Sequence, residues 1–82
     1  MDISTVIWAG ADVARDLNLE IGSVSTDGFC VSFCRGDSVD IVTIFGDGAL
    51  LFKCEHISAA DYRALLGIAK YHELELIEVQ NG

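Results

Sequence analysis

The sequence predicts a single small α+β domain: an N-terminal helix, an antiparallel β-meander, a second helix and a short C-terminal strand. Apolar residues recur at helical spacing near both ends of the chain and alternate with period two through its middle. With 82 residues, 51% of them hydrophobic, the chain can fill one compact core, and no proline or low-complexity segment marks a linker. We therefore expect residues 1–82 to form one domain with both helices on one face of the sheet.

The first element is predicted to be a helix. Its apolar residues follow three- and four-residue spacing and form one stripe, Ile3, Val6, Ile7, Gly10, Val13, Ala14 and Leu17. Asp2 or Ser4 supplies a cap for this helix. The β-branched residues within 3–7 favour instead a short strand ahead of a helix that begins near Ala9. We prefer a single helix because the stripe continues without a break to Leu17.

The alternating apolar residues in the middle of the chain predict the strands of the meander. Glycine-containing turns separate the runs at Asp27-Gly28, at residues 35–38 and at Gly46-Asp47-Gly48, because glycine adopts the positive φ that tight hairpins require. Within each run, alternate residues share a face of the sheet. The three alternating sets are Phe29, Val31 and Phe33; Val39, Ile41, Thr43 and Phe45; and Leu50, Phe52 and Cys54.

A second helix is predicted after Ser58. Asp61 stands three residues later, in the pattern of a capping box, and the helical stripe that follows consists of Tyr62, Leu65, Leu66 and Ala69. We expect this helix to run to about Tyr71, and His72 to favour the helix dipole at its C-terminal end. The tail alternates glutamates with apolar residues, which favours an acidic final strand over a continuation of the helix.

Cysteine and histidine supply the ligand types of a Cys3His zinc site, namely Cys30, Cys34, Cys54 and His56. Their expected placement argues against it, because residues four apart in a strand are separated by about 13 Å and alternate strands by roughly 10 Å. We expect free, packed thiols and no metal or cofactor. Cys54 and His56 share one side of the predicted strand, which allows a thiolate nucleophile. No orienting group or oxyanion site accompanies them in the sequence, so we predict no enzymatic activity.

The charge of the chain is strongly negative, with five basic against thirteen acidic residues, a net charge of -8 and a pI near 4.3. Such a surface repels nucleic acid and anionic membranes, and it attracts basic protein surfaces. No basic N-terminal region or apolar run of ~20 residues indicates a signal or a membrane span, and the three cysteines fit a reducing compartment. We expect a cytoplasmic protein whose charge either keeps it soluble or steers it to a basic partner.

Carboxylates held on a rigid surface can imitate the charges of a nucleic-acid backbone. The predicted partner-binding carboxylates lie in turns and in the tail, and they are Asp27, Asp37, Asp47, Glu73, Glu75 and Glu78. Trp8 falls opposite the apolar stripe of the first helix. Either the first element is a strand or a loop covers this ring, or Trp8 is an anchor in an oligomer or partner interface.

In size, acidity, lack of proline and compact α+β layout, the chain resembles the small inhibitors of phages and mobile elements, particularly anti-CRISPR proteins. These proteins share no common motif, so the resemblance assigns no role to any residue here. It implies a stoichiometric, non-enzymatic inhibitor in the cytoplasm of a bacterial host, which blocks the basic nucleic-acid-binding site of a defence complex by DNA mimicry. The alternatives are an immunity protein or antitoxin that neutralises a nuclease, and a self-associating structural or regulatory subunit.

Overall fold

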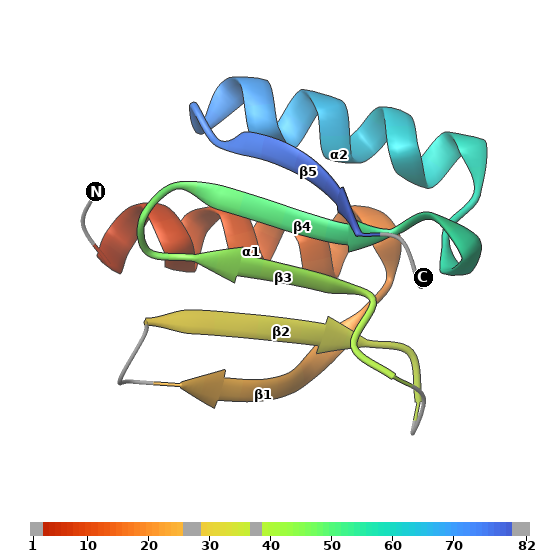
Figure 1. Ribbon diagram of the computed structural model, residues 1–82, viewed down its shortest axis with the longest axis horizontal. Coiled ribbons are helices and arrows are strands. Elements are labelled where there is room, and N and C mark those ends of the chain that lie inside the picture. The colour runs from red at the N-terminus through yellow and green to blue at the C-terminus, as the bar shows by residue number, and fades with distance from the viewer. Residues whose placement is uncertain (1–2, 26–28, 37–38, 80–82) are drawn as a thin grey trace.

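The computed structural model describes residues 3–25, 29–36 and 39–79. Five strands form one sheet in the order β1-β2-β3-β4-β5, in which the first four are antiparallel and β5 is parallel to β4 (Figure 1). This arrangement confirms the predicted α+β class. The elements are α1 (Ile3–Leu17), β1 (Glu20–Ser25), β2 (Cys30–Cys34), β3 (Val42–Phe45), β4 (Ala49–Lys53), the 3-10 helix η1 (Cys54–His56), α2 (Ala59–Tyr71) and β5 (Glu75–Val79).

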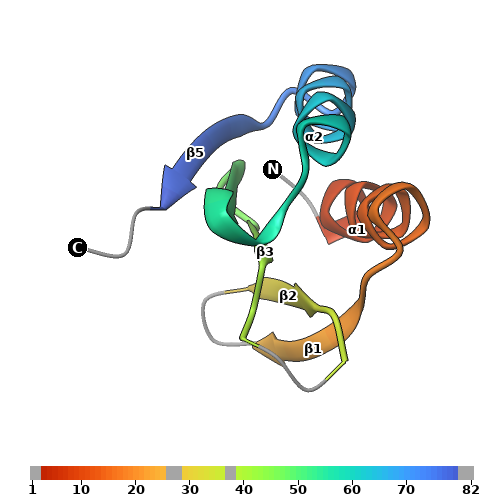
Figure 2. The ribbon, with the colours of Figure 1, turned by 90° about the vertical axis from the view of Figure 1, so that its right-hand side faces the viewer.

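Both helices lie on one face of the sheet, as Figure 2 shows. α1 packs on β2 and β3, α2 packs on β5, and the two helices contact each other. The core lies between these two layers, and burial of each large apolar side chain there stabilises the fold by roughly 1.5–3 kcal/mol relative to exposure. The largest fully buried side chains are Phe33, Ile44, Leu50, Leu65, Val6, Val13 and Val42.

The single N-terminal helix is confirmed, but its buried stripe is narrower than predicted. Ile3 and Ile7 are 49% and 57% exposed, whereas Val6 and Val13 are buried. The physical reason is that two helices do not cover five strands, so β1 projects beyond α1. Ile21 and Val24 on β1 consequently remain exposed on the helix-facing side. Between α1 and the first two strands lies a groove of about 500 Å³ whose lining includes Ile3, Ile7, Ile21, Val24 and Phe33; we call it the apolar groove.

The boundaries of the strands differ from the predicted alternating sets at three places. Phe29 lies outside β2 with a φ of 58°, and its carbonyl accepts a hydrogen bond from Gly46 N at 2.7 Å. β3 begins at Val42, although Ile41 N still donates to Phe33 O at 2.7 Å. Cys54 is not a strand residue, because the chain turns into η1 directly after β4.

The start and the end of the second helix follow the prediction, but its buried stripe does not: Tyr62 and Leu66 are 41% and 43% exposed, while Leu65 and Ala69 are buried together with Ile68. Ser58 Oγ accepts from Asp61 N, and Asp61 Oδ2 accepts from Ser58 N, each at 3.1 Å, which completes the capping box. α2 ends at Tyr71 as expected, and His72 is its C-cap residue. Glu73 turns the chain with a φ of 57°, and β5 then pairs with β4. Within the described ranges, neither helix has the length and apolar character needed to cross a membrane.

Candidate functional site

Three of the predicted partner-binding carboxylates lie at one end of the sheet. Asp47 occupies the turn between β3 and β4, where its Oδ1 accepts from Ala49 N at 3.2 Å. Glu75 N donates to Gly48 O at 2.8 Å, so β5 begins beside this turn, and Glu73 lies in the connection that precedes β5. Figure 1 shows the β3–β4 turn and the α2–β5 connection at the same end. We call the exposed residues Asp47, Glu73 and Glu75 the acidic cluster.

Basic side chains do not neutralise the acidic cluster. Among the described residues, no lysine, arginine or histidine forms an ion pair with any of its three carboxylates. Two of the three arginines pair elsewhere, Arg15 with Asp12 and Asp16 on α1, and Arg35 with Asp61 at the start of α2. Since its three carboxylates have no ion-pair partner among the described residues, the acidic cluster presents negative charge.

Glu78 does not join the acidic cluster. Glu78 pairs in register with Phe52, near the other end of β5, and borders a shallow hollow beside Tyr62. Asp27 and Asp37 lie outside the described residues. Of the four predicted carboxylates within the described residues, the structure therefore brings three together.

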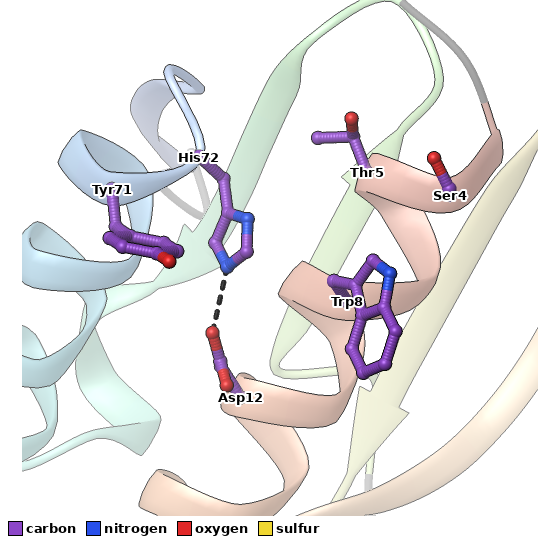
Figure 3. Close-up of a pocket in the computed structure, with 6 residues that line it drawn as sticks. All are labelled: Ser4, Thr5, Trp8, Asp12, Tyr71 and His72. Carbon is purple, nitrogen blue, oxygen red and sulfur yellow. Dashed lines mark hydrogen bonds and ion pairs between the residues drawn. The ribbon is translucent and has the colours of Figure 1, made fainter.

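Trp8 points outward from α1, as its position opposite the apolar stripe predicts. It is 66% exposed. On the far side of a hollow of about 440 Å³ lies Tyr71, the last residue of α2, which is 81% exposed. Figure 3 shows this hollow between the first half of α1 and the end of α2. We call it the aromatic pocket, and its lining residues are Ser4, Thr5, Trp8, Asp12, Tyr71 and His72.

A carboxylate–imidazole pair forms one wall of the aromatic pocket. His72 Nε2 lies 2.7 Å from Asp12 Oδ2, and the His72 side chain is only 9% exposed. The ring of Tyr71 meets the His72 ring edge-on, with centroids 4.9 Å apart. Asp12 Oδ1 also lies 3.0 Å from Arg15 Nη2. The contact joins the end of α2 to the middle of α1, and it was not predicted because 60 residues separate Asp12 from His72.

The Arg15 guanidinium forms ion pairs with two carboxylates on the exposed side of α1, those of Asp12 and Asp16. Its Nε donates to Asp16 Oδ1 at 2.8 Å, and this hydrogen bond lowers the pKa of the Asp16 carboxyl. Asp16, and then Asp12, in turn raise the pKa of Arg15. Two carboxylates thus share one guanidinium, and this side of α1 retains negative charge.

We compared the chain with protein families, curated proteins and solved structures. No match to it was found. Its own charges, exposed aromatic rings and contacts are therefore the basis for a functional conclusion.

The cysteine and histidine candidates are not arranged as the sequence predicted. Cys54 and His56 lie in η1 and do not share one side of a strand, so the geometry considered for a thiolate nucleophile is wrong. Cys30, Cys34 and Cys54 are free thiols; Cys34 is buried, but Cys54 is exposed, so the prediction of a packed thiol is wrong for Cys54 because η1 lies at the surface. Within the described ranges, no group of three or more histidine, cysteine, aspartate or glutamate side chains could hold a metal ion.

Proposed function

We propose that this protein is a non-enzymatic inhibitor that binds the basic nucleic-acid-binding site of another protein through the acidic cluster and the neighbouring rings of Trp8 and Tyr71. The supporting observation is that three exposed carboxylates without an ion pair among the described residues lie at the β3–β4 turn and at the start of β5. The exposed rings of Trp8 and Tyr71 border a pocket that also includes His72, the residue that precedes Glu73 of the acidic cluster. Tryptophan and tyrosine are enriched among the side chains that dominate binding energy, while surrounding charges steer the encounter.

A basic groove that binds nucleic acid carries lysine and arginine side chains spaced to meet phosphates. The acidic cluster offers carboxylates on regular structure, since Glu75 belongs to β5 and Asp47 is held by its hydrogen bond to Ala49 N. Ordering such groups on binding costs little side-chain entropy compared with a disordered acidic tail. The net charge of -8 attracts the basic groove and repels the nucleic acid that competes for it.

The resemblance to anti-CRISPR proteins suggests the kind of partner. We infer that the target is a nucleic-acid-binding effector complex of bacterial defence, met in the bacterial cytoplasm. A nuclease bound by an immunity protein or an antitoxin presents the same basic surface and is the alternative target. Neither case requires direct contact of this protein with nucleic acid or with a membrane.

The test is competition with nucleic acid on purified candidate effector complexes and nucleases. The wild-type protein should inhibit nucleic-acid binding, and its affinity for the target should fall roughly tenfold or more between 50 and 200 mM salt, because each ionic contact adds to the salt dependence. The variant Asp47→Asn/Glu73→Gln/Glu75→Gln should lose inhibition. A matched variant that removes the same charge elsewhere, Glu20→Gln/Asp40→Asn/Glu55→Gln, should retain it.

Equal losses in the two triple variants would show that total charge, and not the acidic cluster, is responsible. Binding that does not weaken with salt would point to an apolar interface. Absence of both association and inhibition at low salt, across the candidate targets, would refute the proposal.

A second candidate function, a self-associating structural or regulatory subunit, is favoured by the apolar groove. Its rim carries four exposed side chains, Ile3, Ile7, Ile21 and Val24, and contiguous exposed apolar surface marks interaction sites. Trp8 does not line this groove, so self-association there is independent of the aromatic pocket. Light scattering tests it: a monomer at high concentration eliminates this function, and a dimer that Ile7→Lys dissociates supports it.

A further inference from the structure

The aromatic pocket presents hydrogen-bond acceptors and the faces of two aromatic rings. Asp12 keeps 26% of its side chain exposed, and each of its oxygens has one partner, Arg15 or His72. A carboxylate offers about four lone-pair positions, so both oxygens can accept a further hydrogen bond. Since Asp12 and Asp16 share the single guanidinium of Arg15, the wall formed by α1 attracts a further cation.

His72 adds an acceptor that points into the same space. Because Nε2 faces the Asp12 carboxylate, the neutral imidazole carries its proton on Nε2 and leaves Nδ1 as an acceptor. Figure 3 shows Nδ1 directed to the side of the pocket on which Thr5 and Trp8 lie. The His72 side chain is nine-tenths buried, and no described residue occupies Nδ1. An acceptor on the wall of the pocket can accept a hydrogen bond from a donor of a ligand.

Trp8 and Tyr71 give the pocket its selectivity for a cation. Both rings are largely exposed and border the pocket on opposite sides of His72 (Figure 3). A cation over the face of a tryptophan or tyrosine ring gains about 0.5–2 kcal/mol, the larger value when it is desolvated. A guanidinium is planar, stacks on such rings and donates several hydrogen bonds in fixed directions, whereas an ammonium is a strongly hydrated point charge.

We infer that the aromatic pocket is a receptor for an arginine side chain of the protein partner, with the guanidinium stacked on Trp8 and donating to Asp12 and to His72 Nδ1. This inference relies on the proposed function for the origin of the arginine, but its chemistry follows from the pocket alone. Nucleic-acid-binding grooves are rich in arginine, so the acidic cluster brings such a surface to the pocket and the pocket holds one of its side chains.

Trp8 is the single tryptophan of the chain and reports directly on the pocket. The experiment titrates the intact protein with N-acetylarginine methylamide at constant ionic strength and follows Trp8 fluorescence. We expect a saturable change with a dissociation constant on the order of millimolar, which suits a single side chain. N-acetylcitrulline methylamide, which has the same shape without the charge, should produce no saturable change, and N-acetyllysine methylamide should bind several-fold more weakly.

Two variants locate the site. Asp12→Asn keeps an acceptor for His72 but removes the charge, and it should weaken arginine binding about tenfold. Tyr71→Leu should weaken it several-fold, whereas Tyr62→Leu, at another exposed tyrosine outside the pocket, should leave it unchanged. Circular dichroism verifies that each variant is folded. No saturable response to the arginine probe, equal responses to the citrulline or lysine probe, or indifference to Asp12→Asn would overturn the inference.

The outcome separates the pocket from the proposed function. Binding of the arginine probe combined with no inhibition of any target would leave the pocket established and refute the inhibitor. Inhibition that depends on the acidic cluster but is unchanged by Asp12→Asn and Tyr71→Leu would establish the inhibitor and refute the pocket.

Discussion

Two helical glycines allow the packing of α1 on the sheet to be tested with one substitution at two sites. Gly67 in α2 is exposed, and a Cβ added there meets nothing within 4 Å. Gly67→Ala should therefore gain the full helix-propensity difference and raise the free energy of unfolding by about 0.8–1 kcal/mol. For a domain of this size, that gain raises the melting temperature by roughly 4–8 °C.

The same substitution at Gly10 should have the opposite sign. A Cβ on Gly10 would lie 3.0 Å from Phe33 Cζ, inside the ~3.5–4.0 Å optimum for two carbons, and the ring of Phe33 is 2% exposed. Overpacking costs about 1–3 kcal/mol, which exceeds the propensity gain. We expect Gly10→Ala to lower the free energy of unfolding by about 1 kcal/mol, so that the two variants melt roughly 8–16 °C apart.

Calorimetry or thermal circular dichroism measures both melting temperatures. The cause is checked in a Phe33→Leu background, where the crowded ring is absent and Gly10→Ala should cost less than in the wild type. If Gly10→Ala stabilises the protein as much as Gly67→Ala does, then α1 does not approach Phe33 as closely as the structure places it.

Three further results are expected. Ser58→Ala removes one half of the capping box and should lower the free energy of unfolding by about 1 kcal/mol in urea denaturation. Asp12→Ala deprives the buried His72 Nε2–H of its acceptor and should cost roughly 1–3 kcal/mol in the same assay. Arg15→Met should raise the pKa of Asp16 towards its ordinary value in a carbon-13 NMR titration. Because the folded-state pKa of Asp16 is lowered, its small stabilising effect is present above the ordinary aspartate pKa and is lost as the pH falls through the folded-state value.

Features encoded within a few residues were predictable from the sequence. The capping box at Ser58 and Asp61 uses side chains that bond to the backbone three residues away, so its pattern fixes the start of α2. The outward direction of Trp8 likewise follows from the helical period alone. Alternation in β3 predicts which residues share a face but not which face is buried, because both of its faces carry apolar residues. The structure buries Val42 and Ile44 against the helices.

Features that depend on distant parts of the chain were not predictable. The Asp12–His72 contact joins two helices whose relative position is set by the core, so no local spacing indicates it. The end of β4 at Lys53 was also not predictable from local spacing. Cys54 continues the alternating pattern, but the chain must turn there to cross over into α2. The exposure of Ile3 and Ile7 depends on how many strands α1 has to cover, and the spacing of apolar residues in the helix does not contain that information.

α1 contributes residues to both the apolar groove and the aromatic pocket, and the helical geometry keeps these two surfaces apart. Consecutive residues of a helix point about 100° from each other, so Ile7 faces the apolar groove while its neighbour Trp8 faces the aromatic pocket. Ile7→Lys should therefore abolish any self-association and leave arginine binding intact. Trp8→Phe should weaken arginine binding, followed by calorimetry in place of fluorescence, and leave any self-association intact. If either substitution altered both properties, the two surfaces would be coupled through α1, and the view that the helix presents two separate interfaces would fail.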